Sequence, residues 1–365
     1  MPKLPVTPVL ISILLAIASA AALAGAQTPV AAEVEAGIEV DADAEVDAEA
    51  ATDIAIEAAT GTPTLATVVV SGVQPGPGLW RVSDQAGHAL WILGTLSPVP
   101  RRMRWESAEV ERVLAEAGSI LTEPGATVRA KVGLFAGLGM LPTAMRARNN
   151  PERQRLVEIV PEADYRRWTV LRQRYLGSGT AIEKRRPILA ADALFREALD
   201  DSGLTADDRV WPVLRKLARK HEVEIVDVRV AVEISDPKAA LKQFAREDLD
   251  DLPCFTATLT RLETDLEAMR QRANAWAIGD IETLRELPYR DQEVVCAQAM
   301  LASEVAREQG ITDLPARVRA AWLDAAEAAL ARDATSFAVL PMRTLLAEDG
   351  LLAELGRRGY RVEQP

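Results

Sequence analysis

The sequence predicts an α+β fold, in which a small mixed sheet joins strands from both ends of the folded part and a large helical section lies between them. Three observations predict it. Short strand-like apolar patterns occur between residues 80 and 123 and again between 336 and 362, the chain between them has mostly helical periodicity, and no repeat of fixed length occurs. We expect the folded domain to span residues 78–365.

The first 26 residues have the composition of a secretory signal peptide. Met1-Pro2-Lys3 is a short basic region, an apolar run extends from Val9 to Ala24, and small residues surround Ala26. We therefore expect cleavage near Ala26 and a periplasmic or secreted protein. An uncleaved anchor is the alternative, because the apolar run is almost long enough to span a bilayer. No later stretch reaches ~18 apolar residues, so we expect no transmembrane domain after cleavage.

Residues 27–77 form a compositionally separate segment. No basic residue lies between Lys3 and Arg81, and no aromatic residue precedes Trp80. The acidic residues are ten in number: Glu33, Glu35, Glu39, Asp41, Asp43, Glu45, Asp47, Glu49, Asp53 and Glu57. With alanine in most gaps, the segment offers too little apolar surface to offset its ordering entropy. It is predicted to be a disordered, self-repelling linker.

The folded part should open with a hairpin. The strand patterns at 80–82 and 88–93 flank Asp84-Gln85-Ala86-Gly87, a turn-forming cluster. A helix is predicted over 106–117 and a third strand over 118–123.

The pattern from 127 to 220 is mostly helical, and the apolar, glycine-rich stretch 132–141 is interpreted as a flexible core helix. Helices should begin at Pro187 and after Asp208, since proline and capping-box residues favour helix starts. A strand is expected over 222–230. The later predictions are helices from Asp236, over 253–278, from Asp280, over 290–308 and over 314–332, a strand over 336–340, a short helix after Gly350, and a strand over 360–362.

The charge balance disfavours a nucleic-acid binder. The formal net charge is -12, and the ten acids of the linker account for most of it. The folded part therefore lacks the basic surplus that nucleic-acid binding needs. Clusters such as 101–104 and 184–186 are interpreted as solvated surface.

Two residue types with reactive side chains are scarce. Cys254 and Cys296 are the only cysteines, and they lie on consecutive predicted helices. In an exported protein we expect them to form a disulfide, with two buried free thiols as the alternative. His88 and His221 are the only histidines, and neither belongs to a metal-binding or triad spacing.

Several short motifs together resemble the TraB/GumN family, which is related to the TIKI metallopeptidases. The similarity spans most of the chain from Leu79 to Val362. Its motifs are Leu79-Trp80-Arg81-Val82-Ser83, Trp91-Ile92-Leu93-Gly94-Thr95-Leu96-Ser97, Thr122-Glu123, Trp276-Ala277-Ile278-Gly279-Asp280, Arg290-Asp291 and Gly359-Tyr360-Arg361-Val362. The resemblance implies a divalent metal held by two histidines and the glutamate at the position of Glu123.

This chain departs from the family pattern at both histidines. Ser97 follows Gly94 where the first histidine belongs, and Thr344 stands at the second position. Imidazole is a good neutral ligand for such ions, whereas an un-ionised hydroxyl is a poor one. We therefore expect no metal and no other cofactor.

The resemblance places six residues at a degenerate site: Gly94, Ser97, Glu123, Arg290, Arg343 and Thr344. A carboxylate, guanidinium groups and hydroxyls suit an anionic or sugar-like ligand. The leading interpretation is an exported, non-catalytic protein that binds an envelope ligand or partner. One alternative is a metal-dependent hydrolase or peptidase that uses oxygen ligands such as Glu123, Glu348 or Asp349. Another is that the polar groups only satisfy one another.

Overall fold

The computed structural model describes residues 73–74, 78–105, 107–130, 134–287 and 292–365. The predicted signal segment lies outside these residues, as does all of the predicted linker except Val73–Gln74. These two residues form strand β1, which pairs in parallel with β5 (Arg104–Trp105).

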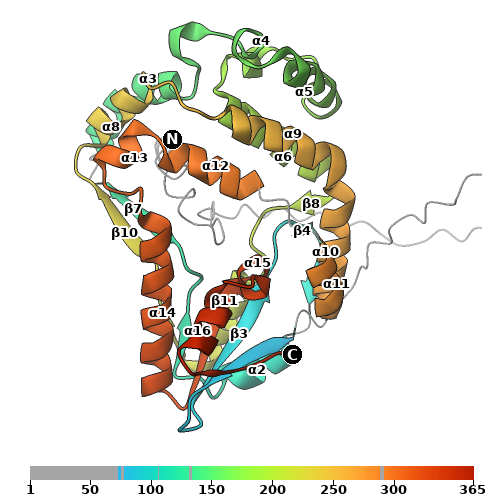
Figure 1. Ribbon diagram of the computed structural model, residues 1–365, viewed down its shortest axis with the longest axis vertical. Helices are drawn as coiled ribbons and strands as arrows, with labels where there is room; N and C mark the ends of the chain where they lie inside the picture. Colours follow the sequence, from blue (N-terminus) through green and yellow to red (C-terminus); the bar gives the residue numbers. More distant parts are fainter. Residues whose placement is uncertain (1–72, 75–77, 106, 131–133, 288–291) are drawn as a thin grey trace, which may run out of the picture.

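A six-stranded mixed sheet forms the centre of the molecule (Figure 1). Its strands, in spatial order, are β12 (Arg361–Glu363), β2 (Leu79–Ser83), β3 (Ala89–Thr95), β11 (Thr335–Pro341), β6 (Ser119–Leu121) and β9 (Glu224–Val226). The predicted hairpin is present as antiparallel β2 and β3, and the sheet unites strands from both ends of the folded part. The predicted fold class is confirmed.

The four strands β3, β11, β6 and β9 run parallel to one another. Strand β11 is inserted between β3 and β6, and its register pairs Pro341 with Thr95 and Ala338 with Leu121. Because parallel strands end at the same edge, the residues that follow β3, β6 and β11 are brought together there. In open sheets with parallel strands, this carboxyl edge is the usual place for a binding site.

Helices predicted from the apolar periodicity of the sequence cover the sheet. These are α2 (Ala108–Leu114), α7 (Trp211–His221), α14 (Leu314–Arg332) and α16 (Leu351–Arg357). The bounds of α14 match the predicted range, and its Trp322 packs with β11 residue Phe337 in one core, both fully buried. Complete burial of two aromatic side chains stabilises by a few kcal/mol each, which anchors α14 to the sheet.

The helical middle lies mostly above the sheet in Figure 1. Its elements are α3 (Leu134–Ala147), η1 (Pro151–Arg153), α4 (Leu156–Ile159), α5 (Glu162–Tyr175), η2 (Ala181–Lys184), α6 (Pro187–Asp201), α8 (Pro237–Phe244), α9 (Leu252–Thr264), α10 (Leu266–Ile278), α11 (Ile281–Glu286), α12 (Gln292–Leu301) and α13 (Glu304–Glu308). It has apolar clusters of its own, one of which packs Trp168 against Phe255 and Leu194. No helix in the described ranges is long and apolar enough to cross a membrane.

Two long predicted helices are each divided into two. The helix expected over 253–278 breaks at Asp265, whose buried side chain accepts a hydrogen bond from Arg272 Nη2 at 2.7 Å. The pattern over 290–308 breaks at Ser303, whose hydroxyl accepts from the backbone N–H of Ala306 at 3.0 Å. Ser303 therefore caps the second helix of its pair through its side chain, whereas Asp265 marks its break by pairing with a buried arginine of the following helix.

The helical prediction for 127–220 is wrong at its start. Strand β7 (Ala126–Ala130) pairs in parallel with β10 (Val230–Ile234), far away in the sequence. The strand expected over 222–230 is in fact two, β9 and β10, separated by a turn in which Asp227 accepts from the N–H of Arg229 at 3.1 Å. A second short pair joins β4 (Val99–Pro100) to β8 (Leu204–Thr205). Pairing between distant segments leaves no local periodicity from which to predict it.

Helices α9 and α12 bring the two cysteines together. Cys254 and Cys296 lie at disulfide-bonding distance, with their Cα atoms 4.6 Å apart. This is inside the range that a disulfide requires. The geometry therefore supports the predicted pairing.

Candidate functional site

The carboxyl edge of the parallel strands holds a buried acid. Glu123 follows β6 by two positions and is 7% exposed. The hydroxyl of Thr95, the last residue of β3, donates a short hydrogen bond to Glu123 Oε1 and also lies 3.4 Å from the carbonyl oxygen of Leu340 in β11. The Thr95 hydroxyl group thus connects the ends of three neighbouring strands, β3, β6 and β11.

Burial raises the pKa of Glu123 from its usual 4.5 to about 7, since the charged form loses its hydration. The hydrogen bond from Thr95 opposes this shift, the negative charge of Asp208 adds to it, and the positive charge of Arg343 again opposes it. Near neutral pH the carboxyl group is therefore divided between its neutral and charged forms. It can donate or accept a hydrogen bond, and such displaced pKa values are typical of functional sites.

Arg343 connects the sheet edge with the helical middle. It lies on α15 (Met342–Leu346), directly after β11, and its Nη1 donates to Glu293 Oε2 on α12 at 3.0 Å. The other oxygen of Glu293 lies 3.5 Å from Arg261 Nη1 on α9. One carboxylate therefore links a guanidinium group near Glu123 to one from the helical middle.

Gly94 has a packing role at this edge. A Cβ atom there would lie 2.6 Å from Met342 Cε and 2.9 Å from Leu345 Cδ1, so any larger residue would require these two side chains of α15 to shift. The carbonyl of Gly94 accepts a hydrogen bond from Trp276 Nε1 at 3.0 Å. Two of the family-like motifs thus contact each other directly.

The two residues at the histidine positions contact other groups than Glu123. The hydroxyl of Ser97 donates to the carbonyl of Ala206 at 3.5 Å. Thr344 is half-buried on α15, and its carbonyl closely approaches Gly350. Within the described residues, no hydrogen bond joins Ser97 or Thr344 to Glu123. Arg290, the remaining residue of the predicted site, lies outside the described part of the chain.

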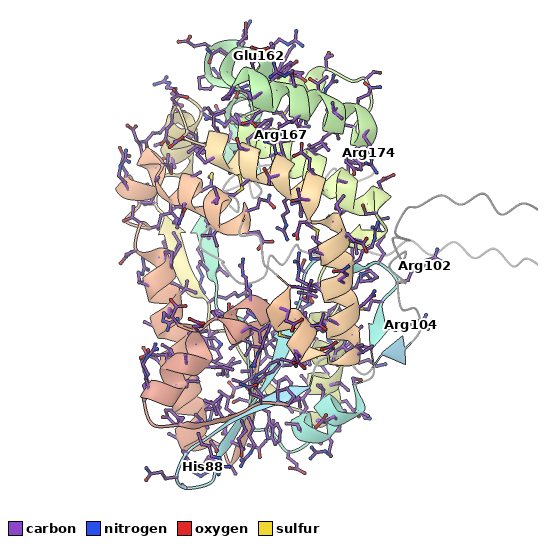
Figure 2. The ribbon with its side chains drawn as sticks, turned by 45° about the vertical axis from the view of Figure 1, so that its right-hand side comes forward. His88, Arg102, Arg104, Glu162, Arg167 and Arg174 are labelled. Carbon is purple, nitrogen blue, oxygen red and sulfur yellow. A yellow bond between two sulfur atoms is a disulfide. The ribbon has the colours of Figure 1, made fainter. Side chains whose placement is uncertain are left out.

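These residues do not fit the divalent metal that the family resemblance implies. Glu123 is hydrogen-bonded to Thr95, and the described ranges contain no group of three His, Cys, Asp or Glu side chains that could hold a metal ion. Both histidines are paired elsewhere: His88 Nδ1 with Asp84 at 2.9 Å, and His221 Nε2 with Glu111 at 3.1 Å. Figure 2 shows His88 at the hairpin turn, the opposite end of β3 from Thr95.

Sequence reasoning missed three residues that shape the site, namely Thr95, Asp208 and Glu293. Thr95 belongs to a family-like motif and is the last residue of strand β3. This position could have identified it as a residue of the site. Asp208 was identified only as a helix-capping residue, which it is, since it accepts from the N–H groups of Val210 and Trp211. Nothing in the sequence indicated that Glu293 would meet Arg343.

Comparisons with known proteins agree with this arrangement of motifs. No curated protein and no solved structure matches the chain. The model of the TraB/PrgY/gumN family matches residues 78–364, which is most of the chain and includes every strand of the six-stranded sheet. The chain therefore belongs to the TraB/PrgY/gumN family.

Proposed function

We propose that this member of the family is exported and acts in the cell envelope by binding a ligand or partner, without metal-dependent hydrolysis. One observation carries the proposal: the buried acid of the site, Glu123, is hydrogen-bonded to Thr95, while hydroxyl residues stand where the family resemblance places imidazoles.

The chemistry of the donor set supports a non-catalytic role. Two imidazoles and a carboxylate make a competent site for a divalent ion, but two un-ionised hydroxyls contribute little affinity. Each good ligand is worth several kcal/mol on the scale of structural zinc sites. Loss of both imidazoles therefore lowers metal affinity by many orders of magnitude. The alternative ligands Glu348 and Asp349 are exposed and do not join Glu123 in a metal-binding group of the described residues.

The remaining groups suit an anionic or sugar-like ligand. Glu123 can donate or accept a hydrogen bond near pH 7, as its raised pKa of about 7 allows. Arg343 adds a guanidinium group that is 21% exposed and held by Glu293. Guanidinium groups bind carboxylates and phosphates in a defined geometry, and paired donors and acceptors bind sugar hydroxyls.

The first test measures metal content and hydrolysis. The purified chain, dialysed after incubation with Mn²⁺, Co²⁺ or Zn²⁺, should retain no stoichiometric metal and should cleave no peptide library. The double variant Ser97→His/Thr344→His asks whether imidazoles restore metal retention, and Ser97→Gln/Thr344→Gln controls for added bulk. Hydrolysis by the natural chain that Glu123→Gln abolishes would replace this proposal with the oxygen-ligand hydrolase.

The second test measures binding. A panel of acidic and neutral oligosaccharides should contain members that raise the thermal midpoint of the natural chain. Arg343→Gln should remove the rise for acidic members, whereas Arg361→Gln, at a guanidinium group 77% exposed on β12, should leave it unchanged. A rise that persists in Arg343→Gln would place binding elsewhere.

The third test concerns export. N-terminal sequencing of protein from a periplasmic fraction should begin near Gln27. Intact Met1 in the membrane fraction would instead indicate an uncleaved anchor.

A further inference from the structure

The helical middle gathers cations from two distant segments into one surface, which we name the basic face. Its members are Arg146, Arg148, Arg153, Arg155, Lys184 and Arg185. The backbone brings the two segments side by side. Asn149 and Arg185 form an antiparallel bridge, the N–H of Asn150 donates to the carbonyl of Lys184 at 2.9 Å, and the N–H of Arg186 donates to the carbonyl of Arg148 at 3.1 Å.

The charges of the basic face are not neutralised by the folded part. Among the described residues, none of its six side chains forms a salt bridge with a carboxylate. Burial lowers the pKa of Arg185, the like charge of Arg148 lowers it further, and the negative charge of Asp192 opposes both effects. Neighbouring arginines differ, since Arg166 pairs with Glu162 and Arg196 with Asp192. The basic face is thus a concentration of positive charge that an anion would stabilise.

Exposed apolar residues are close to these cations in the sequence. Met145, next to Arg146 at the end of α3, is 53% exposed, and Val157, two positions after Arg155, is 49% exposed. These are two of the five large apolar residues most exposed in the described ranges. A partner for this surface should therefore be acidic and also carry small or branched apolar groups.

The chain contains a segment of this composition, residues 33–57, which we name the acidic segment. It carries ten carboxylates and no basic residue. From Glu39 to Glu49, acids occupy every second position and Ala or Val the positions between them. When such a stretch is extended, its carboxylates lie on one side and its apolar side chains on the other.

The covalent connection is long enough for this contact. Val73 is held in β1, so only residues 58–72 lie between Glu57 and the folded part; a flexible chain of this length has a root-mean-square span of about 21 Å and reaches at most about 55 Å when extended. A folded part of about 290 residues has a radius of gyration of about 19 Å, or roughly 50 Å across. A tether of this length presents the acidic segment to the surface at an effective concentration of about a millimolar.

We propose that the acidic segment docks on the basic face of its own chain. In this proposal the carboxylates of the segment pair with the cations, and its small apolar residues supply the complement to exposed apolar residues such as Met145 and Val157. Pairing through charge and small apolar contacts requires no single fixed conformation of the segment, so its linker-like composition is compatible with docking. Because the acidic segment is covalently attached, its effective concentration at the basic face exceeds the concentration of a dilute free anion, which favours the segment as the occupant.

Zero-length carbodiimide cross-linking of the full chain tests the proposal, because it joins carboxylates to nearby lysine amines. Lys184 is the lysine of the basic face, and Lys216 on α7 is an equally exposed reference outside it. Mass spectrometry should find links from residues 33–57 to Lys184 at least about fivefold more abundant than to Lys216. Adding 0.5 M NaCl should remove most of this excess, since salt screens exposed charges.

A matched pair of variants separates the basic face from general attraction to positive charge. The variant Arg153→Glu/Arg155→Glu keeps Lys184, so the same cross-links can be measured. It should lower the abundance of cross-links between residues 33–57 and Lys184 severalfold. Arg102→Glu/Arg219→Glu makes the same charge change at exposed sites elsewhere and should leave the Lys184 links unchanged. Figure 2 shows Arg102 near Arg104, below the helices at the top of the view. Equal links to Lys184 and Lys216, or links insensitive to Arg153→Glu/Arg155→Glu, would overturn the proposal.

Two other occupants are distinguished in the same preparation. Mixing unlabelled with ¹⁵N-labelled chain should yield links within single chains, and mostly mixed-isotope links would assign the face to a second copy. Vesicles with 30% phosphatidylglycerol should not reduce the Lys184 links. Loss of these links on the vesicles, together with vesicle binding that Arg153→Glu/Arg155→Glu abolishes, would assign the face to an anionic membrane and overturn the proposal.

Discussion

Two buried acids, Asp265 in the helical middle and Glu123 at the sheet edge, have opposite surroundings. Asp265 is 2% exposed and accepts from Arg272 at 2.7 Å, with Arg261 Nε 3.6 Å away. Glu123 is 7% exposed and has a threonine hydroxyl as its hydrogen-bond partner, with no salt bridge among the described residues. A buried charge is stable only when it is paired or becomes neutral. Asp265 uses the first solution and Glu123 the second.

This contrast indicates which of the two acids has a structural role and which is available for binding. Arg186, another buried charge of the helical middle, is satisfied by the carbonyls of Ala147, Phe244 and Glu247. Groups satisfied in this way stabilise one arrangement of helices and have no capacity left for a ligand. Glu123 retains the ability to change its protonation state near neutral pH, which makes it the stronger functional candidate.

The largest expected effect is on the paired acid. Asp265→Ala removes the carboxylate that pairs with the buried Arg272 and lies beside Arg261, which should lower the free energy of unfolding by about 3–5 kcal/mol. Urea denaturation measures this loss. Glu267→Ala is the matched control, because its exposed carboxylate lies 3.3 Å from Arg270 and should contribute less than about 1 kcal/mol. Equal losses for the two variants would show that the buried pair is not structural.

The disulfide should make a contribution of similar size in the same region. Cys254 and Cys296 are separated by 42 residues, and closing a loop of that length stabilises by about 4 kcal/mol in the chain-entropy model. Cys254→Ser/Cys296→Ser should lose a comparable amount in urea denaturation, and reduction of the natural protein should reproduce the loss. Thiol labelling of both cysteines in native, unreduced protein would contradict the pairing.

Glu123 should make stability depend on pH. Its folded pKa of about 7 exceeds its usual 4.5, so the folded state binds the proton more tightly than the unfolded state between these values. The resulting stability is fully present below about pH 4.5 and is lost as pH rises through 7. The shift corresponds to about 3 kcal/mol.

Glu123→Gln keeps a neutral side chain at every pH and should remove this decline. The difference between the natural protein and the variant, measured by urea denaturation at pH 5 and pH 8, isolates Glu123 from Asp251, whose pKa is also raised by burial, to about 6. Glu116→Gln, at an exposed acid after α2, should leave the decline unchanged. If Glu123→Gln declines as much as the natural protein between pH 5 and pH 8, Glu123 does not have the raised pKa that this prediction uses.

The smallest expected effect tests the connection between the two regions. The positive charge of Arg343 lowers the pKa of Glu123, so Arg343→Gln should raise it further by a fraction of a unit. A ¹³C NMR titration of the glutamate carboxyl groups measures the midpoint. Arg361→Gln, on the far strand β12, should have no effect. A fall in the pKa of Glu123 on removing Arg343 would reverse the assigned electrostatic roles.

Local pattern was sufficient for the parts of the fold that local interactions determine. Apolar periodicity located α14 at Leu314–Arg332, a turn cluster located the hairpin of β2 and β3, and the cysteine pair on α9 and α12 is at bonding distance. Helical and strand periods are visible in a single segment because neighbouring side chains share one face. The family motifs likewise identified Glu123 as a residue of the carboxyl edge.

Only the tertiary structure decided the contacts between distant segments. It paired β7 with β10, divided a long helix at Asp265, and placed the hydroxyl of Thr95 on Glu123. It also joined two basic segments through the bridge between Asn149 and Arg185. These outcomes depend on which groups are buried together, since burial determines whether a charge is paired, neutralised or left for a partner. That environment is formed by residues far apart in the sequence, so no single segment contains it.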